Sequence, residues 1–216
     1  MITAHGGALG TGRNTRLYFD NIGLYCADAI EVDIYRKDGL LYLSHLPAPL
    51  SYRKKVTLKE AFELVKRTGH KINCDLKMRG LVGDVIKLAE EVGVTENLIF
   101  TGAVRLSDSA QLTEGQAWLN KIEGLPYTAA NVPAIKKVLE ETGNPHFAGL
   151  NINKRYGTDE FLAACRDNGV ELSVFTLDDY RRLSRFIGWG VANVTTNLPT
   201  VAADIRRKTL TSGGAR

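Results

Sequence analysis

Cysteine is scarce in this 216-residue chain, and the three that occur lie far apart. Cys26, Cys74 and Cys165 lack the paired spacing of a zinc site, and an odd number argues against a disulfide framework. We therefore expect buried free thiols in a reducing compartment.

Long apolar runs and long runs of one charge are also missing. No apolar segment is long enough to cross a bilayer. Met1 is followed almost at once by a predicted strand, so we expect no signal peptide. No basic run is longer than Arg53-Lys54-Lys55, and the net charge is only +4, so nothing indicates a nucleic-acid partner. We expect a cytoplasmic protein without stable membrane insertion, whose mild charge is compatible with a small anionic substrate.

The chain alternates predicted strands and helices. Strands are expected at 2–5, 29–34 (extended by 40–45 after the turn Asp38-Gly39), 71–76, 97–101, 117–122, 147–152, 171–175 and 191–195. Helices are expected at 58–68, 81–92, 132–141, 158–167, 178–187 and 201–208. This order favours a (β/α)₈ barrel. The rival, an open doubly wound sheet, lacks its Gly-x-Gly-x-x-Gly signature here. We expect one domain over residues 1–210 and a disordered tail over 211–216.

Two acidic residues interrupt an apolar strand near the N-terminus. Glu31 and Asp33 are two positions apart, so their side chains project from the same face of the strand. Buried carboxylates are costly unless something neutralises them. A hard divalent cation would do so, and salt bridges to a lysine such as Lys77 are the structural alternative.

The next strand repeats this pattern with Asp75 and Lys77. Asp75 offers a third carboxylate that would complete a site for Mg²⁺ or Ca²⁺. Lys77 would either hold an anionic oxygen of the substrate or act only as the counter-charge of Asp75. In a barrel these residues fall at the carboxyl ends of strands, where active sites of this fold lie.

Two of the four histidines also lie at the carboxyl ends of predicted strands. His5 and His45 end two of the N-terminal segments, beside the carboxylates, and imidazole can accept or donate a proton near neutral pH. We expect these two to form an acid/base pair. His70 and His146 precede strands, at the end of a barrel where structural residues are expected.

The order of these motifs resembles the glycerophosphodiester phosphodiesterase family. That family's pattern runs His-Arg-Gly, Glu-Asn-Thr, Glu-x-Asp, Asp-Gly, His-Asp, Thr-Leu-x-Glu, Glu-x-Lys and Thr-Asp-x-Pro. The corresponding segments here are His5-Gly6-Gly7, Arg13-Asn14-Thr15, Glu31-Val32-Asp33, Asp38-Gly39, His45-Leu46, Thr57-Leu58-Lys59-Glu60, Asp75-Leu76-Lys77 and Thr196-Asn197-Leu198-Pro199. Their order and spacing agree over nearly the whole chain.

The resemblance implies a (β/α)₈ barrel and a metal-dependent phosphoric diester hydrolase that releases an alcohol and glycerol 3-phosphate. By the same resemblance, the carboxylates described above bind Mg²⁺ or Ca²⁺, and the two histidines are the acid/base pair, without an indication of which is the acid. Lys77 matches a lysine close to the phosphate. Phe175 stands where an aromatic residue lines the family's pocket. The implied partner is a small phosphodiester.

Several positions depart from the family pattern. Gly6 replaces an arginine, Leu46 replaces the aspartate after the second histidine, and Asn197 replaces the late aspartate. Arg13, where the family has glutamate, would replace the lost arginine in space. Asp75 is aspartate rather than glutamate, and the segment after the second histidine is short; both features are similar to sphingomyelinase D-type phospholipases. Two alternatives therefore stand beside the main one: a phosphodiesterase of that type, or a catalytically impaired barrel that binds a phosphorylated ligand.

Lys121 is a further candidate, expected in the strand 117–122 and pointing into the barrel. There it would supply a charge beside the phosphate or, if buried, form a Schiff base in a lyase or aldolase. Lys77 is open to the same second interpretation. Asn151 and Asn153 share a face of the strand 147–152 and its end, where they would bind substrate hydroxyls or cap a loop. The sequence leaves the oligomeric state and the alcohol group open.

Overall fold

The computed structural model describes residues 1–47 and 55–213. Residues 214–216 of the expected tail, and Arg53 and Lys54 of the basic run, lie outside the described residues. Among the described residues, no helix has the length and apolar character needed to cross a membrane.

Eight parallel strands form a closed barrel, because β1 pairs with both β2 and β9. The strands are β1 (Ile2–Ala4), β2 (Ala29–Lys37), β4 (Lys71–Leu76), β5 (Leu98–Gly102), β6 (Gln116–Leu119), β7 (Phe147–Asn153), β8 (Glu171–Phe175) and β9 (Asn193–Thr196). The segment expected to extend the second strand is β3 (Leu40–Leu43), which folds back antiparallel on β2 through the Asp38-Gly39 turn. The predicted (β/α)₈ barrel is therefore confirmed, with one added hairpin strand.

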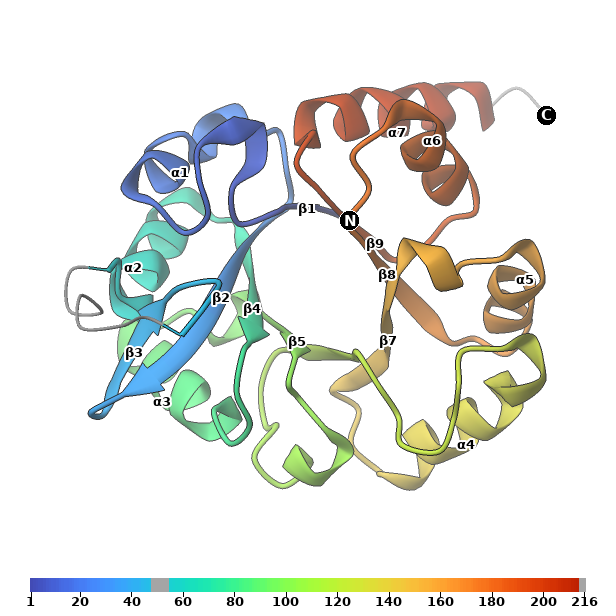
Figure 1. Cartoon of the computed structure of the whole chain (residues 1–216), viewed down its shortest axis with the longest axis horizontal. Helices are drawn as coiled ribbons and strands as arrows, with labels where there is room; N and C mark the ends of the chain where they lie inside the picture. Colours follow the sequence, from blue (N-terminus) through green and yellow to red (C-terminus); the bar gives the residue numbers. More distant parts are fainter. Residues whose placement is uncertain (48–54, 214–216) are drawn as a thin grey trace.

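Helices surround the strands (Figure 1). They are α1 (Arg16–Asp20), α2 (Leu58–Thr68), α3 (Val82–Val92), α4 (Val132–Glu141), α5 (Asp159–Asp167), α6 (Tyr180–Gly188) and α7 (Pro199–Gly213). The sequence features that begin and end a helix are clearest in α2. Thr57 accepts a hydrogen bond from the Glu60 amide, the Glu60 carboxylate accepts one from the Thr57 amide, and Gly69 ends the helix with φ 72°.

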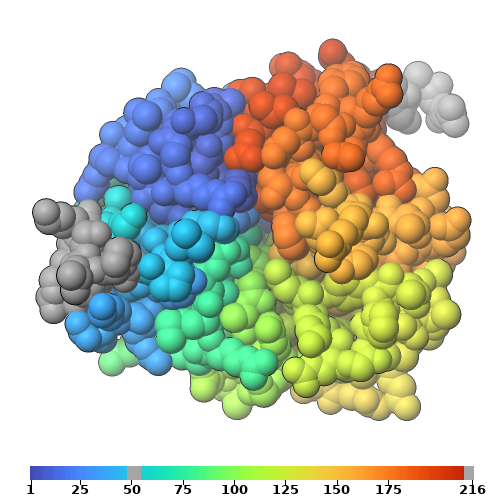
Figure 2. All heavy atoms as spheres, viewed as in Figure 1, coloured from blue at the N-terminus to red at the C-terminus, as the bar shows by residue number. Residues whose placement is uncertain are grey.

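The barrel interior is filled in layers rather than open. Ala29, Ile99 and Trp118 form an apolar plug at the end where the strands begin. A layer of neutral polar side chains follows: Thr3 donates to Asn193, which donates to Ser173, and across the barrel Thr101 donates to Asn73. In the space-filling view side chains fill the centre of the ribbon ring, and the N-terminal and C-terminal segments meet along one seam (Figure 2). This packing leaves the carboxyl ends of the strands as the place for a site.

Three expectations are corrected by the fold. β6 ends at Leu119, so the strand expected over 117–122 is shorter. The helix α7 continues to Gly213, so residues 211–213 are helical and not part of a disordered tail. Cys74 and Cys165 are buried free thiols as expected, but Cys26 is exposed.

Candidate active site

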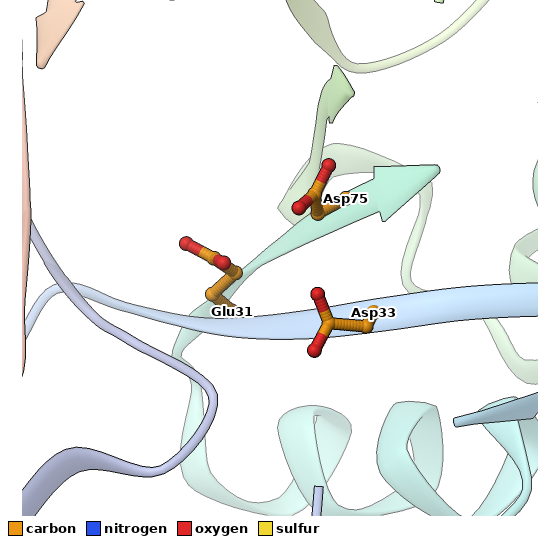
Figure 3. Close-up of side chains that lie close together, drawn as sticks. All are labelled: Glu31, Asp33 and Asp75. Carbon is orange, nitrogen blue, oxygen red and sulfur yellow. The ribbon is translucent and has the colours of Figure 1, made fainter. Parts of the chain in front are cut away.

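Three carboxylates converge at the carboxyl ends of two neighbouring strands (Figure 3). Glu31 and Asp33 project from one face of β2, and the parallel register places Asp33 directly beside Asp75 of β4. One oxygen from each of the three residues lies within 4.8 Å of the others. Hard divalent cations prefer such all-oxygen sets, so the donor chemistry fits Mg²⁺ or Ca²⁺.

The electrostatics of this group are unfavourable without a cation. Burial raises the pKa of Glu31 well above its ordinary value, and the neighbouring charges of Asp75 and Asp33 raise it further. Burial also raises the pKa of Asp75, although Lys77 opposes the shift. Two of the three carboxyls therefore hold their protons more tightly than free side chains do, as expected of a site that a positive ion would stabilise.

Lys77 supplies part of the missing positive charge. Its ammonium lies 2.7 Å from Asp33 Oδ1 and also contacts the Asp75 carboxylate. Burial would lower the pKa of Lys77, but the charges of Asp75 and Asp33 outweigh burial and raise it. The amine is therefore held protonated. A Schiff base needs a neutral amine, so this position does not suit the lyase or aldolase interpretation.

Asn14 fixes the position of Asp33 through two hydrogen bonds. Its amide donates to Asp33 Oδ2 at 2.7 Å, and its side-chain oxygen accepts from the Asp33 backbone amide at 3.0 Å. Burial raises the pKa of Asp33, but the charge of Lys77 and the hydrogen bonds from Lys77 and Asn14 outweigh it, leaving the pKa below its ordinary value. Asp33 is thus the carboxylate of the three that the protein itself keeps ionised.

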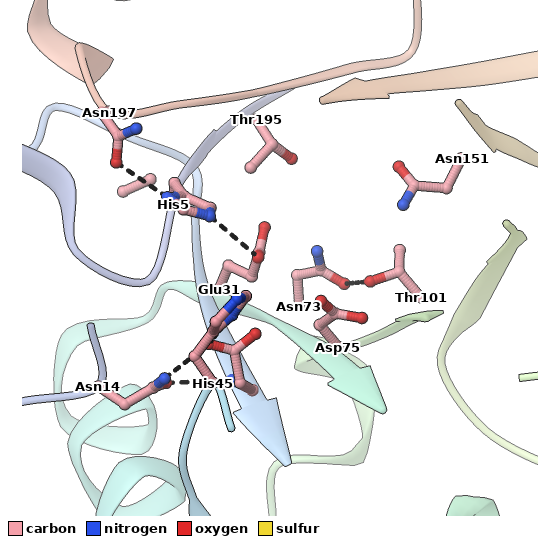
Figure 4. Close-up of polar contacts among 12 residues, drawn as sticks. His5, Asn14, Glu31, His45, Asn73, Asp75, Thr101, Asn151, Thr195 and Asn197 are labelled. Carbon is pink, nitrogen blue, oxygen red and sulfur yellow. Dashed lines mark hydrogen bonds and ion pairs between the residues drawn. The ribbon is translucent and has the colours of Figure 1, made fainter. Parts of the chain in front are cut away.

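His5 follows β1 and lies over Glu31, with 3.9 Å between Nε2 and Glu31 Oε1 (Figure 4). Its other ring nitrogen, Nδ1, lies 2.9 Å from Asn197 Oδ1. The Asn197 amide in turn donates to Asp178 Oδ2 at 2.8 Å, and its backbone amide donates to Asp178 Oδ1 at 2.8 Å. A carboxylate only accepts, so it fixes the Asn197 oxygen toward His5, and Nδ1 must carry the hydrogen. Nε2 of neutral His5 is then a free acceptor facing the carboxylates.

His45 approaches the same carboxylates from the hairpin side. It follows β3, its side chain is 40% exposed, and its Nδ1 lies 3.5 Å from Asp33 Oδ2. That distance is too long for a hydrogen bond, and Nδ1 has no hydrogen-bond partner among the described residues. The two histidines thus contact different carboxylates of one cluster, in different environments.

The remaining predicted site residues, Arg13, Phe175 and Lys121, differ in exposure and in their distance from the strand ends. Arg13 is exposed, but it is near enough for its charge to lower the pKa of Glu31. Phe175 is half-buried at the end of β8, two positions after the inward-facing Ser173. The placement of Lys121 is wrong: it lies beyond the end of β6 and is exposed, because Asn120 takes the inward position that follows Trp118. Lys121 therefore suits neither a buried Schiff base nor a contact inside the barrel.

Asn120 was not predicted from the sequence. Asn151 and Asn153 were predicted to share one role, and the structure gives them different ones. Asn120 Oδ1 accepts from the Gly102 amide and from Asn151 Nδ2, each at 2.9 Å. Asn153, in contrast, caps the single turn η7 (Lys154–Tyr156) by accepting from the Arg155 amide. Alternation of side chains along the strand was the available signal, since Trp118 and Asn120 must share a face.

Gly102 was missed as well, and no sequence motif marks it. Its φ is +78°, and a Cβ built there would overlap Asp75 Oδ1 and the Leu76 carbonyl. The residue therefore has to be glycine for Asp75 to occupy its place.

His70 and His146 lie away from this cluster, as expected. His70 borders a hollow at the opposite end of the barrel together with Met1, and burial lowers its pKa. The ring of His146 contacts the Gly115 carbonyl at 2.7 Å.

Solved structures with a similar backbone include glycerophosphodiester phosphodiesterases. One from Parabacteroides distasonis has 15% sequence identity and a TM-score of 0.77, covering 97% of this chain and 97% of that chain. One from Thermotoga maritima has 18% identity and a TM-score of 0.67, covering 95% and 97%. A phosphodiesterase from Oleispira antarctica, solved with the product sn-glycerol-3-phosphate, has 20% identity and a TM-score of 0.72, covering 97% and 96%.

The chain has the fold of the glycerophosphodiester phosphodiesterases. No protein-family model matches the sequence, and no curated protein matches it. The similarity to these solved structures therefore lies in the backbone and not in overall sequence identity.

Proposed function

We propose that the protein is a metal-dependent phosphodiesterase that cleaves a glycerophosphodiester to an alcohol and glycerol 3-phosphate. The observation that carries the proposal is the convergence of Glu31, Asp33 and Asp75 within 4.8 Å, with a histidine next to two of them. The fold and the product bound in the Oleispira antarctica phosphodiesterase support the same substrate class.

The three carboxylates would hold Mg²⁺ or Ca²⁺. The bound ion would offset the negative charge that develops on the phosphorus oxygens. Lys77, already charged and on the same face, would contact a phosphate oxygen, with Arg13 approaching from the loop after β1. Phe175 would contact the glycerol moiety from the end of β8.

The hydrogen bonds around His5 support the role of proton acceptor for this residue. With Nδ1 donating to Asn197, the lone pair of Nε2 faces the cluster. In the proposed reaction His5 takes the proton from the attacking hydroxyl, either of water or of the neighbouring substrate alcohol. The oxygen of that hydroxyl forms a new bond to phosphorus as the bond to the leaving alcohol breaks.

His45 is assigned the complementary role of proton donor. Its Nδ1 lies 3.5 Å from Asp33 Oδ2, whereas His5 contacts Glu31, so the two rings approach the cluster at different carboxylates. His45 donates its proton to the leaving alkoxide, so the alcohol departs neutral. Its partial exposure is consistent with a position at the entrance of the site.

A barrel that binds a phosphorylated ligand without cleaving it is the second candidate. Gly6 has no side chain that could contact a phosphate. Leu46, which is 68% exposed, has no carboxylate that could orient His45. A Cβ at Gly6 would meet only ordinary contacts, at 3.4 Å or more. The backbone at this position therefore has room for the first carbon of the arginine side chain that the family has there.

A panel of phosphodiesters, assayed with and without divalent ions, separates the candidates. We expect turnover that disappears with EDTA, returns with Mg²⁺ or Ca²⁺, and is lost in Glu31→Gln. Asp84→Asn, which removes an exposed carboxylate that pairs with Arg36, should retain activity. Full activity in EDTA contradicts the metal role. Thermal stabilisation by glycerol 3-phosphate without turnover of any diester favours the binding barrel.

A further inference from the structure

An open hollow of about 460 Å³ lies in the loops that follow β6 and β7. Its walls include Lys121, Leu125, Tyr127 and Tyr156, none of which has a role in the mechanism above. Such a mixture of apolar and aromatic surface with a few polar groups is typical of small-molecule sites.

The hollow is joined to the cluster through Asn120, which lines it. Asn120 accepts from the Gly102 amide at 2.9 Å, and Gly102 is packed against the Asp75 carboxylate. The hollow is therefore connected to the carboxylates through the ends of β6 and β5.

Asn151 adds a second sign of a ligand. It is only 7% exposed, and its amide is fixed by Asn120, so its Oδ1 has a set direction. That oxygen is buried without a hydrogen-bond partner among the described residues. A buried acceptor without a donor is unfavourable. Asn151 is not among the residues that line the hollow, so a hydroxyl group that satisfies it would have to extend past Asn120 into the barrel mouth.

Among the described residues that line the hollow, the charged one is Lys121, a cation. The Arg155 guanidinium lies 4.7 Å from the centre of the Tyr156 ring, and the charge of Arg105 acts on Tyr127. Glu123 belongs to the same loop but is not among the residues that line the hollow. The Tyr127 and Tyr156 rings meet edge to face, with 5.5 Å between their centres. Aromatic walls alone would attract a quaternary ammonium group, but these cations oppose it.

We propose that this hollow receives the alcohol group of the diester and selects an uncharged alcohol over a quaternary ammonium alcohol such as choline. The inference rests on the proposed phosphodiesterase function, since it places the leaving alcohol of that reaction. A cation at an assumed separation of roughly 4 to 8 Å from the alcohol should disfavour a positive group about two- to fivefold in a water-like dielectric.

The test compares glycerophosphocholine with glycerophosphoglycerol, which carries an uncharged alcohol. We expect the wild type to have the higher kcat/KM for the uncharged substrate. Lys121→Gln should raise the choline-to-glycerol ratio of kcat/KM about two- to fivefold, through KM. Lys71→Gln is the matched control, because Lys71 is exposed at the opposite end of the barrel and its loss should leave the ratio unchanged.

Binding provides a second readout that does not depend on turnover. In a His5→Ala background the dissociation constants of the same two diesters should differ in the same direction, and Lys121→Gln should reduce that difference. An unchanged ratio in both readouts, an equal loss for both substrates, or a wild type that prefers choline overturns the inference. Absence of turnover with the expected binding preference contradicts the proposed function and leaves the hollow's selectivity supported.

Discussion

The two walls of the barrel mouth differ in chemistry. On one side, β1, β2, β4 and the hairpin strand β3 present carboxylates, a lysine and two histidines. On the other, β5 to β9 present hydroxyls and amides, among them Thr101, Asn120, Asn151 and Thr195. Figure 4 shows this division, with the charged groups of β1 to β4 facing the neutral groups across the opening.

The difference separates charge chemistry from substrate positioning. The charged wall contains groups whose favoured protonation states depend on one another, so a change in one residue alters the rest. The neutral wall is connected by hydrogen bonds between uncharged groups, such as Asn151 to Asn120 and Asn193 to Ser173. Substitutions on the charged wall should therefore change the reaction step, and those on the neutral wall should change substrate preference.

The largest effect is expected on the charged wall, from His5→Ala. Loss of a general base typically lowers the rate about 10²- to 10⁴-fold, and kcat should fall by this amount with little change in KM. His70→Gln, at the opposite end of the barrel, is the control and should keep wild-type kcat. Steady-state kinetics with a glycerophosphodiester measure both. Equal losses in the two variants would contradict the assignment of His5.

Most of the charged wall could be predicted from the sequence, because it follows strand periodicity. Glu31 and Asp33 lie two positions apart and Asp75 lies one strand along, so a parallel sheet must bring them together. Contacts made by loops are different. Asp178 reaches His5 through Asn197, and no local pattern indicates that pairing.

The neutral wall was harder to predict, for two physical reasons. Asn and Thr are common in loops and caps, so their type does not distinguish a barrel interior from a surface turn. The end of β6 also decided the placement of Lys121, because a strand that stops at Leu119 lets the chain turn outward after Asn120. Strand ends are set by tertiary packing, which periodicity does not encode.

The second prediction concerns Gly102, where the two walls meet. Gly102→Ala places a Cβ against Asp75 Oδ1 and the Leu76 carbonyl at a φ of +78°, so Asp75 must move. Misplacement of a catalytic group by about 1 Å can lower the rate roughly 10²-fold. Gly143→Ala is the control, because its φ is +62° and no atom lies within 4 Å of the added Cβ. If both variants lose stability but neither loses kcat, the carboxylate does not depend on Gly102.

The third prediction tests the hydrogen-bond chain behind His5. In Asp178→Ala the Asn197 amide is free to rotate, so its oxygen is no longer fixed toward His5 Nδ1. We expect kcat to fall roughly tenfold, the value of one hydrogen bond to a charged group. Ring ¹⁵N shifts of His5 should indicate the Nδ1–H form in the wild type and a mixture in the variant. Asp179→Ala removes the neighbouring helix cap instead and should leave the ¹⁵N pattern unchanged.

The smallest effects are on stability, and they should have opposite signs at two neighbouring carboxylates. The pKa of Glu31 is raised in the folded state, so its contribution to stability is present below the unfolded pKa and is lost as pH rises through the folded value. The pKa of Asp33 is lowered, so its contribution is present above the unfolded pKa and is lost as pH falls through the folded value. Without metal at pH 7, Glu31→Gln should therefore raise Tm and Asp33→Asn should lower it. Each kcal/mol corresponds to about 2–4 °C in a chain of this size.

Adding Mg²⁺ should make Tm of the wild type higher than Tm of the Glu31→Gln variant, because a bound cation favours the ionised carboxylate that the variant lacks. Wild-type Tm should rise with Mg²⁺, and Tm of the Glu31→Gln variant should rise less. Thermal unfolding from pH 4 to 8, with EDTA and with Mg²⁺, measures both signs in one series. Equal destabilisation by the two substitutions in EDTA would mean that the buried carboxylates stabilise the fold without a cation. The charged wall would then be a structural network, and the contrast with the neutral wall would concern packing and not catalysis.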